Sequence, residues 1–141
     1  MNNKKIEDLK FGLKSEDTAK IILEKHFGEL FKLDKYNKFD FRNDRYRIEL
    51  KTRRCKFGDY PDLQFELGKI IEARKYKEEN PEKECFFVWR CIGDGWGEEG
   101  FYYWKYNEEE YFEGEGGRND RGLDEWKILA KINNEFIRPL F

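Results

Sequence analysis

Of the 141 residues, 41% are charged and 38% hydrophobic, a balance that favours disorder, but an aromatic content of 18% supplies enough apolar area for one folded domain over residues 1–141. The net charge of −2 argues against a general DNA-coating protein, although basic residues prevail in the first half and acidic residues in the second, which suits an anionic partner on one face. One histidine, one serine and three cysteines without a CxxC pair argue against a Ser-His-Asp triad, a zinc site and a disulfide framework.

The predicted elements begin with a helix over residues 15–28. Ser15 is a suitable N-cap, acidic residues follow in the first turn, apolar residues recur at helical spacing, and Gly28 suits the C-terminal end. Next, "KFDF" and "RYRIELKTR" flank the turn-forming stretch "RND" and predict a β-hairpin. The segment "DLQFELGKIIEARKYKEEN", residues 62–80, carries an apolar stripe and predicts a second helix, which Pro81 ends.

The rest of the chain reads mainly as strands. "CFFVWRC" and "FYYWKY" predict two strands joined by a glycine-rich stretch, "EEEYFEGEGGRNDRG" predicts a surface loop, and "WKILAKI" with "FIRPL" predicts one or two closing strands. The order α-β-β-α-β-β-loop-β indicates an α/β fold with a central sheet flanked by helices. The start of the chain lacks the apolar region of a signal peptide and no apolar run approaches about 18 residues, so we expect an intracellular protein without a membrane span.

Charged side chains gather on one face of the predicted hairpin. Alternation along its second strand puts Glu49 and Lys51 on the same face, about 6–7 Å apart, with Ile48 and Leu50 on the opposite face. Asp40 lies on the first strand between two phenylalanines, which we expect to face the core together while Asp40 faces away. If the strands pair in register through the turn, Asp40 lies near Glu49.

Two carboxylates on neighbouring strands are suited to bind Mg²⁺, which prefers oxygen ligands at about 2.0–2.1 Å and keeps positions open for water and a phosphate oxygen. A lysine close to them is suited to orient an attacking hydroxide or to neutralise the phosphate. The plain alternative is a solvated strand face, because acid-x-lysine triplets also occur at Asp8–Lys10 and Glu125–Lys127. The hairpin and the flanking helices favour the metal site.

The motif "FDF…RIELKTR", with Asp40, Glu49 and Lys51, resembles the core of the PD-(D/E)XK nuclease superfamily, in which an Asp on one strand precedes (D/E)-x-K on the next. The predicted order of elements from Phe11 to Arg90 is similar to the family core, αβββαβ, although Phe39 stands where many members have a proline. The resemblance implies a restriction-endonuclease-like α/β fold, with a central mixed sheet flanked by helices. It also implies an Mg²⁺- or Mn²⁺-dependent endonuclease that hydrolyses phosphodiester bonds, in DNA rather than RNA.

The resemblance implies roles for the hairpin residues. Asp40 and Glu49 would bind the metal together with the Leu50 carbonyl, and Lys51 would assist the attacking water. Family members of this size often pair so that two sites can cut two strands, which implies a homodimer.

Further residues are candidates by their position in the family pattern or in the chain. Glu16, on the first helix, and Gln64, at the start of the second predicted helix, match an acid and a glutamine that many members carry. The helix dipole explains Glu16 equally well, and a glutamine at a helix start is more often an ordinary polar residue. Arg53, Arg54 and Lys56 continue the second hairpin strand as a basic cluster that would bind phosphates, or would be an exposed basic loop.

Two other functions compete with the nuclease. One is a catalytically inactive module of the same fold that binds nucleic acid or a protein partner as a scaffold, which the acidic second half favours. The other is a plain α/β domain in which Asp40, Glu49 and Lys51 form a surface ladder of ion pairs, each worth less than about 1 kcal/mol.

Overall fold

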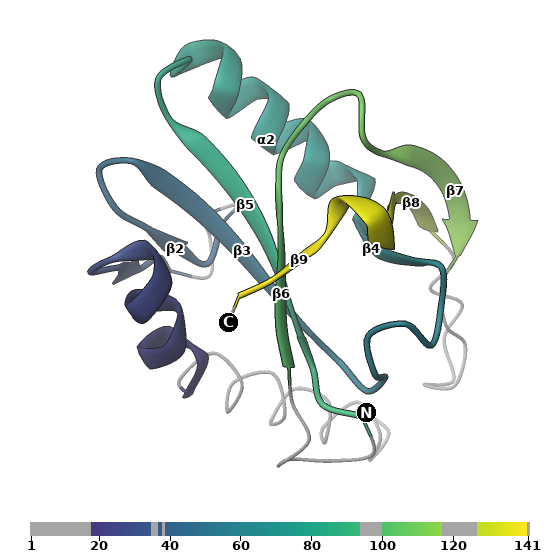
Figure 1. Ribbon diagram of the computed structural model, residues 1–141. Helices are drawn as coiled ribbons and strands as arrows, with labels where there is room; N and C mark the ends of the chain where they lie inside the picture. Colours follow the sequence, from purple (N-terminus) through teal and green to yellow (C-terminus); the bar gives the residue numbers. More distant parts are fainter. Residues whose placement is uncertain (1–17, 35–36, 38, 94–99, 117–126, 141) are drawn as a thin grey trace, which may run out of the picture.

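In the part of the chain that the structure describes, a six-stranded sheet with the order β1-β2-β3-β5-β6-β9 lies at the centre of a mixed α/β fold (Figure 1). The computed structural model describes residues 18–34, 37, 39–93, 100–116 and 127–140. The strands of the central sheet are β1 (Phe31–Lys32), β2 (Phe41–Arg42), β3 (Tyr46–Arg53), β5 (Glu84–Cys91), β6 (Gly100–Lys105) and β9 (Arg138–Pro139). β3 runs parallel to β5 and the other neighbours are antiparallel, so the sheet is mixed, as predicted.

A smaller sheet stands beside helix α2 on one face of the central sheet. Its described strands are β4 (Asp62–Glu66), β8 (Lys127–Asn133) and β7 (Phe112–Gly116), all antiparallel in the order β4-β8-β7. Helix α2 (Leu67–Glu79) follows β4 directly, and the short 3-10 helix η1 (Asn134–Phe136) joins β8 to β9. The direct β4–α2 junction fixes the helix against the sheet.

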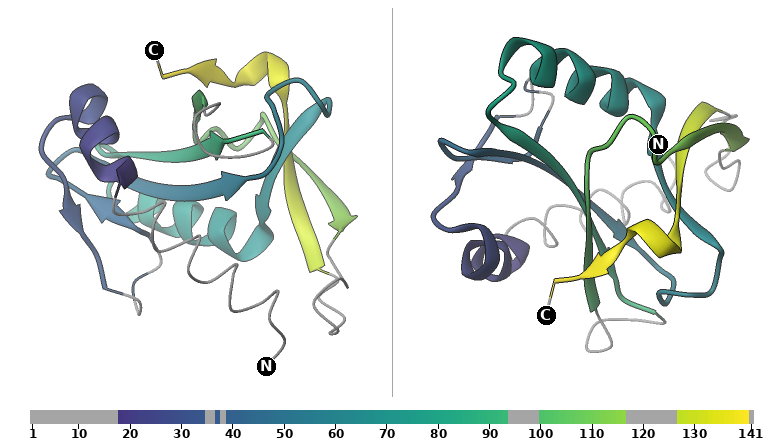
Figure 2. Two further views of the ribbon diagram at one scale, coloured as in Figure 1. Left: turned by 90° about the horizontal axis from the view of Figure 1, so that it is seen from below. Right: turned by 45° about the horizontal axis from the view of Figure 1, so that its top comes forward.

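The central sheet separates two hydrophobic cores, because α2 and the residues of helix 18–27 lie on opposite faces of it (Figure 2). The core under α2 contains fully buried Trp89 and Phe87 of β5 together with residues of β4 and β8. The other core packs Leu23 of helix 18–27 against Ile48 of β3. Residues of β3 and β5 therefore alternate between two buried sides, which explains the near-continuous apolar run of β5.

The hairpin of β2 and β3 is built on a side-chain-capped turn. Asn43 Oδ1 accepts hydrogen bonds from the backbone N–H groups of Arg45 and Tyr46, both at 2.9 Å, as Asn and Asp do in tight turns. Asn43 Nδ2 also donates to the Phe27 carbonyl at the end of helix 18–27, at 3.1 Å. Gly28 follows with a φ of 85°, a left-handed conformation that ends the helix as predicted.

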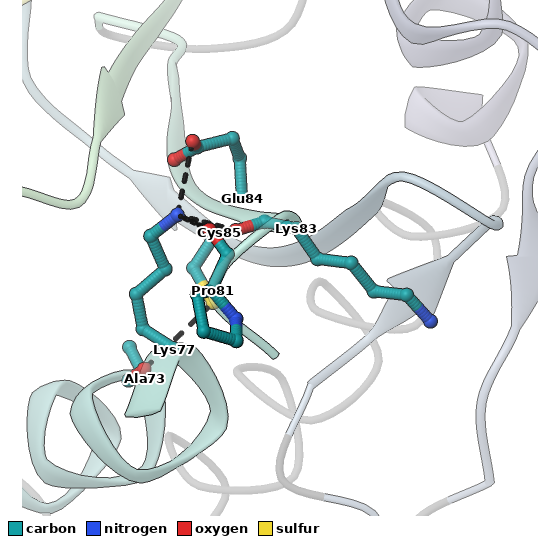
Figure 3. Close-up of polar contacts among 6 residues, drawn as sticks. All are labelled: Ala73, Lys77, Pro81, Lys83, Glu84 and Cys85. Atoms are coloured by element: carbon teal, nitrogen blue, oxygen red, sulfur yellow. Dashed lines mark hydrogen bonds and ion pairs between the residues drawn. The ribbon is translucent and has the colours of Figure 1, made fainter. Parts of the chain in front are cut away.

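The end of α2 is fastened to the start of β5 through Lys77 (Figure 3). Its ammonium donates to the Pro81 carbonyl at 2.9 Å and the Lys83 carbonyl at 2.6 Å, and pairs with Glu84 Oε1 at 3.0 Å. The buried Cys85 thiol, on the same strand, reaches a carbonyl of α2 at 4.0 Å. These contacts fix α2 over the face of the sheet that carries the charged side chains of β3.

Two predicted elements are wrong. The second helix begins at Leu67 and not at Asp62, because residues 62–66 form β4, whose alternate residues Leu63 and Phe65 are buried and which pairs with β8. The stretch predicted as a surface loop contains strand β7, which pairs with the other edge of β8. Both segments form strands because they pair with β8, which lies more than ten residues away in the chain.

The expectation that Phe39 and Phe41 face the same core is also wrong. Phe41 lies in β2 and packs in the core beside helix 18–27, whereas Phe39 lies before the strand and packs in the core under α2. The chain therefore crosses from one side of the sheet to the other at Asp40, which directly precedes β2 and whose carboxylate faces the backbone of β3.

Candidate functional site

The charged side chains of β3 lie under α2 and β4, and not in solvent as a simple hairpin face would. Glu49 is only 6% exposed, and its Oε1 lies 3.3 Å from the ammonium of Lys69 on α2. The ammonium of Lys51 lies 5.8 Å from the ring centre of Phe65 on β4. Glu49 and Lys51 thus share the predicted face, which the helix and the smaller sheet enclose.

Asp40 contacts the backbone on both sides of Glu49. Its N–H donates to the Ile48 carbonyl at 3.0 Å, and its Oδ2 accepts a hydrogen bond from the Leu50 N–H at 2.8 Å. The register that pairs Phe41 with Ile48 continues to set Asp40 opposite Glu49. The predicted proximity of the two acidic residues is therefore confirmed at the level of the backbone.

The Leu50 carbonyl lies on the side of β3 that faces Asp40. The N–H and C=O of one strand residue point to the same side of the strand, and the Leu50 N–H points to Asp40. The carboxylates of Asp40 and Glu49 and this carbonyl are hard oxygen donors, which suit Mg²⁺ or Mn²⁺. No group of three or more His, Cys, Asp or Glu side chains suited to hold a metal occurs among the described residues, so a cation would rely on two carboxylates, the carbonyl and water.

Lys69 is the residue that sequence reasoning missed. It lies in the first turn of α2, a helix whose start was predicted five residues too early, so its approach to Glu49 had no signal in the sequence pattern. Its ammonium compensates the charge of a carboxylate that would otherwise be costly to bury. A divalent cation at Glu49 would have to replace this contact or share the carboxylate with it.

Of the other two predicted catalytic residues, only Gln64 can be placed relative to this group. Glu16 lies outside the described residues. Gln64 lies on β4 between Leu63 and Phe65, whose side chains are on the buried face of the smaller sheet. The Gln64 side chain is therefore on the other face, away from Phe65 and from the Lys51 ammonium beside it. What Gln64 contributes toward the central sheet is its backbone carbonyl, which accepts a hydrogen bond from Trp89 Nε1 at 3.2 Å.

The basic residues Arg53, Arg54 and Lys56 lie where β3 ends and the chain turns toward β4. Arg54 and Lys56 are exposed, while Arg53 is half-buried. The backbone N–H of Lys56 donates to Asp59 Oδ2 at 2.8 Å, which closes a tight turn. The exposed pair Arg54 and Lys56 lies just after the C-terminal end of β3, the strand that carries Glu49 and Lys51.

Comparisons with known proteins add no assignment, since no family model, no curated protein and no solved structure matches the chain. Among the described residues, no helix has the length and apolar character that a membrane crossing requires. A function therefore has to be argued from the geometry of the β2–β3 hairpin and its surroundings.

Proposed function

We propose that the chain is a metal-dependent nuclease that hydrolyses phosphodiester bonds in nucleic acid, DNA rather than RNA. The observation that carries the proposal is the contact of Asp40 with both chain neighbours of Glu49, with Lys51 on the same strand face as Glu49. Two acids and a lysine from two paired strands are the groups that the PD-(D/E)XK pattern requires. The sequence has two other acid-x-lysine triplets, and the contact of Asp40 with the strand beside Glu49 supports the choice of this one.

The order of elements supports the same proposal. Helix 18–27 is followed by β1, β2 and β3, then by α2, then by β5 parallel to β3, which is the order αβββαβ with the short β4 inserted before α2. A parallel pair needs a crossover, and α2 supplies it on the face that carries Glu49. We infer that the domain has the restriction-endonuclease-like fold.

The oxygen donors at the β2–β3 hairpin fit the cation that this fold implies. Asp40, Glu49 and the Leu50 carbonyl would hold Mg²⁺ or Mn²⁺, which when bound acidifies a water and offsets charge on the phosphate. Lys51 would donate to a phosphate oxygen or orient the attacking water from the enclosed face. Glu49 is buried beneath α2, where the lower local dielectric strengthens its electrostatic contacts.

One observation favours a second function. The Lys69 ammonium already compensates the buried Glu49 carboxylate, so no metal ion is needed for its charge. This arrangement suits an inactive module of the same fold that binds nucleic acid or a protein as a scaffold. An intracellular location and a homodimer stay predictions under both functions.

A cleavage assay tests the proposal and separates it from the scaffold. Single-stranded, duplex and branched DNA and RNA are incubated with the protein in Mg²⁺, Mn²⁺ or EDTA. Asp40→Asn removes the charge but keeps an oxygen for the Leu50 N–H, and Lys51→Met removes the ammonium but keeps the apolar chain. Glu113→Gln on exposed β7 is the matched control for loss of one carboxylate.

We expect metal-dependent cutting that Asp40→Asn and Lys51→Met each lower at least about 100-fold and that Glu113→Gln leaves unchanged. Cutting that persists in EDTA, or that survives both substitutions, would contradict the site. If no substrate is cut by a protein that circular dichroism shows to be folded, the nuclease is wrong and the scaffold takes its place.

A further inference from the structure

A cavity of about 400 Å³ lies beside the proposed site, between α2 and the strands β2 and β3. Three cationic side chains line it: Arg42 from β2, Arg47 from β3 and Lys75 from α2. The carboxylates that line it are Glu72 and Glu79 of α2. Positive groups thus outnumber negative ones, and both arginines come from the hairpin that carries the proposed site.

The two arginines are positioned by rings and backbone. The Arg47 guanidinium lies 4.7 Å from the ring centre of Tyr76 and donates to the Asn43 carbonyl at 3.2 Å. The Arg42 guanidinium lies 5.3 Å from the ring centre of Phe31. Within the described residues, neither guanidinium pairs with a carboxylate, so both retain donors for an anion.

The cavity lies next to the proposed site along the hairpin, two residues closer to the β2–β3 turn on each strand. Arg42 follows Asp40 by two residues and Arg47 precedes Glu49 by two residues, and two residues along a strand span about 6–7 Å. This separation is of the order of that between successive phosphates of a nucleic-acid strand. An extended strand with one phosphate at Asp40 and Glu49 would bring its neighbouring phosphate to Arg42 and Arg47.

We propose that this cavity binds the phosphate next to the one that is cut, and so holds the substrate strand in register; the inference rests on the proposed nuclease function. Guanidinium groups bind phosphate oxygens in pairs, and Lys75 adds a third positive charge from α2. The carboxylates of Glu72 and Glu79 lie on the helix side of the cavity and leave the arginine side to the phosphate.

Tyr76 adds an independent observation. Its hydroxyl is buried and, among the described residues, has no hydrogen-bond partner, although buried polar atoms are nearly always satisfied. Burial is the main cause that raises the pKa of Tyr76, so the phenol stays protonated and remains a donor at neutral pH. Tyr76 lines the cavity, so a phosphate bound there would be a candidate acceptor for this hydroxyl.

The test measures binding without cleavage. Fluorescence anisotropy of a labelled DNA oligonucleotide is followed in EDTA at several salt concentrations, for wild type, Lys75→Glu, Arg42→Gln and Lys25→Glu. Lys75 is exposed, so its replacement leaves the fold intact. Lys25→Glu makes the same change of charge on helix 18–27, on the opposite face of the central sheet, and is the control.

We expect Lys75→Glu and Arg42→Gln each to weaken binding about tenfold and to lower the salt slope by about one, as the loss of a phosphate contact does. Lys25→Glu should match wild type. Equal binding by all four proteins, or no binding by wild type, would overturn the inference. If Lys75→Glu and Arg42→Gln bind and cleave DNA like wild type, the proposal for the cavity is wrong and the nuclease proposal stands. If both variants weaken binding but wild type cleaves no substrate with either metal, the nuclease proposal is wrong and the cavity still binds nucleic acid.

Discussion

Among the described residues, Glu49 is the one acidic residue that is buried. Its ion pair with Lys69 bears on both proposed functions. Desolvation disfavours the carboxylate, and the ammonium at 3.3 Å opposes that cost. In a nuclease this cation competes with the metal for the same oxygens, whereas in a scaffold it is simply a structural partner. The two functions therefore predict different consequences of removing it.

Lys69→Met should lower the free energy of unfolding by about 1–2 kcal/mol, less than the loss of a fully buried partner because Lys69 is 35% exposed. Urea unfolding of this variant beside Lys75→Met, which removes an exposed lysine of the same helix, measures the difference. In a nuclease the same substitution should also tighten Mn²⁺ binding. Unchanged stability would mean that the ion pair does not form in solution.

The buried thiols give a pH dependence. Burial raises the pKa of Cys85 and of Cys91 from 9.0 to about 12, and the neighbouring Cys55 thiol adds to the shift of Cys91. The folded state thus favours the protonated thiols, so this contribution to stability is complete below pH 9 and is lost as pH rises toward 12. We expect urea unfolding to show falling stability over that range and a smaller fall in Cys85→Ala. A parallel fall in both proteins would exclude Cys85 as a cause.

At the scale of elements, α2 connects the site to the rest of the sheet. Its N-terminal turn carries Lys69 to Glu49, and its C-terminal turn is fastened to β5 through Lys77 (Figure 3). Helix α2 has no side-chain N-cap bond and no acidic residue in its first turn, so packing and the Lys77 contacts have to hold it. The position of α2 is therefore a condition for the site.

Lys77→Met should lower the free energy of unfolding by about 1–3 kcal/mol, because two carbonyls and a carboxylate lose their common donor. Hydrogen exchange should become faster in the last turn of α2 and at the start of β5. Lys75→Met, without these contacts, is the control. Exchange that rises uniformly over the chain would contradict a local role.

At the scale of the molecule, the sequence predicted what depends on local alternation. The opposite faces of Ile48 and Glu49 on β3, the hairpin and the apolar strand β5 are confirmed. The segment before Leu67 was misread because Leu63 continues the helical stripe of Leu67 and Ile70, whereas residues 62–66 form a strand by pairing with β8. Strand β7 contains glycine and glutamate, which have low strand propensity, so only its pairing with β8 makes it a strand.

For the candidate site too, the sequence predicted only what depends on local pattern. The shared face of Glu49 and Lys51 follows from alternation along β3, and the nearness of Asp40 follows from the register of the hairpin. The faces of Phe39 and Phe41, in contrast, were predicted wrongly. Lys69 and the arginine-lined cavity were not predictable, because both depend on how α2 crosses the sheet. Because residues 62–66 were predicted as helix, the face of β4 on which Gln64 lies could not be predicted.

The most direct measurement is calorimetric titration of Mn²⁺ into wild type, Asp40→Asn, Glu49→Gln and Glu113→Gln. If Asp40 and Glu49 share a divalent cation, wild type and Glu113→Gln bind a single Mn²⁺ per chain, and both Asp40→Asn and Glu49→Gln lose it while staying folded. Wild type that takes up no Mn²⁺, or uptake that neither substitution at the hairpin weakens, would contradict the metal site.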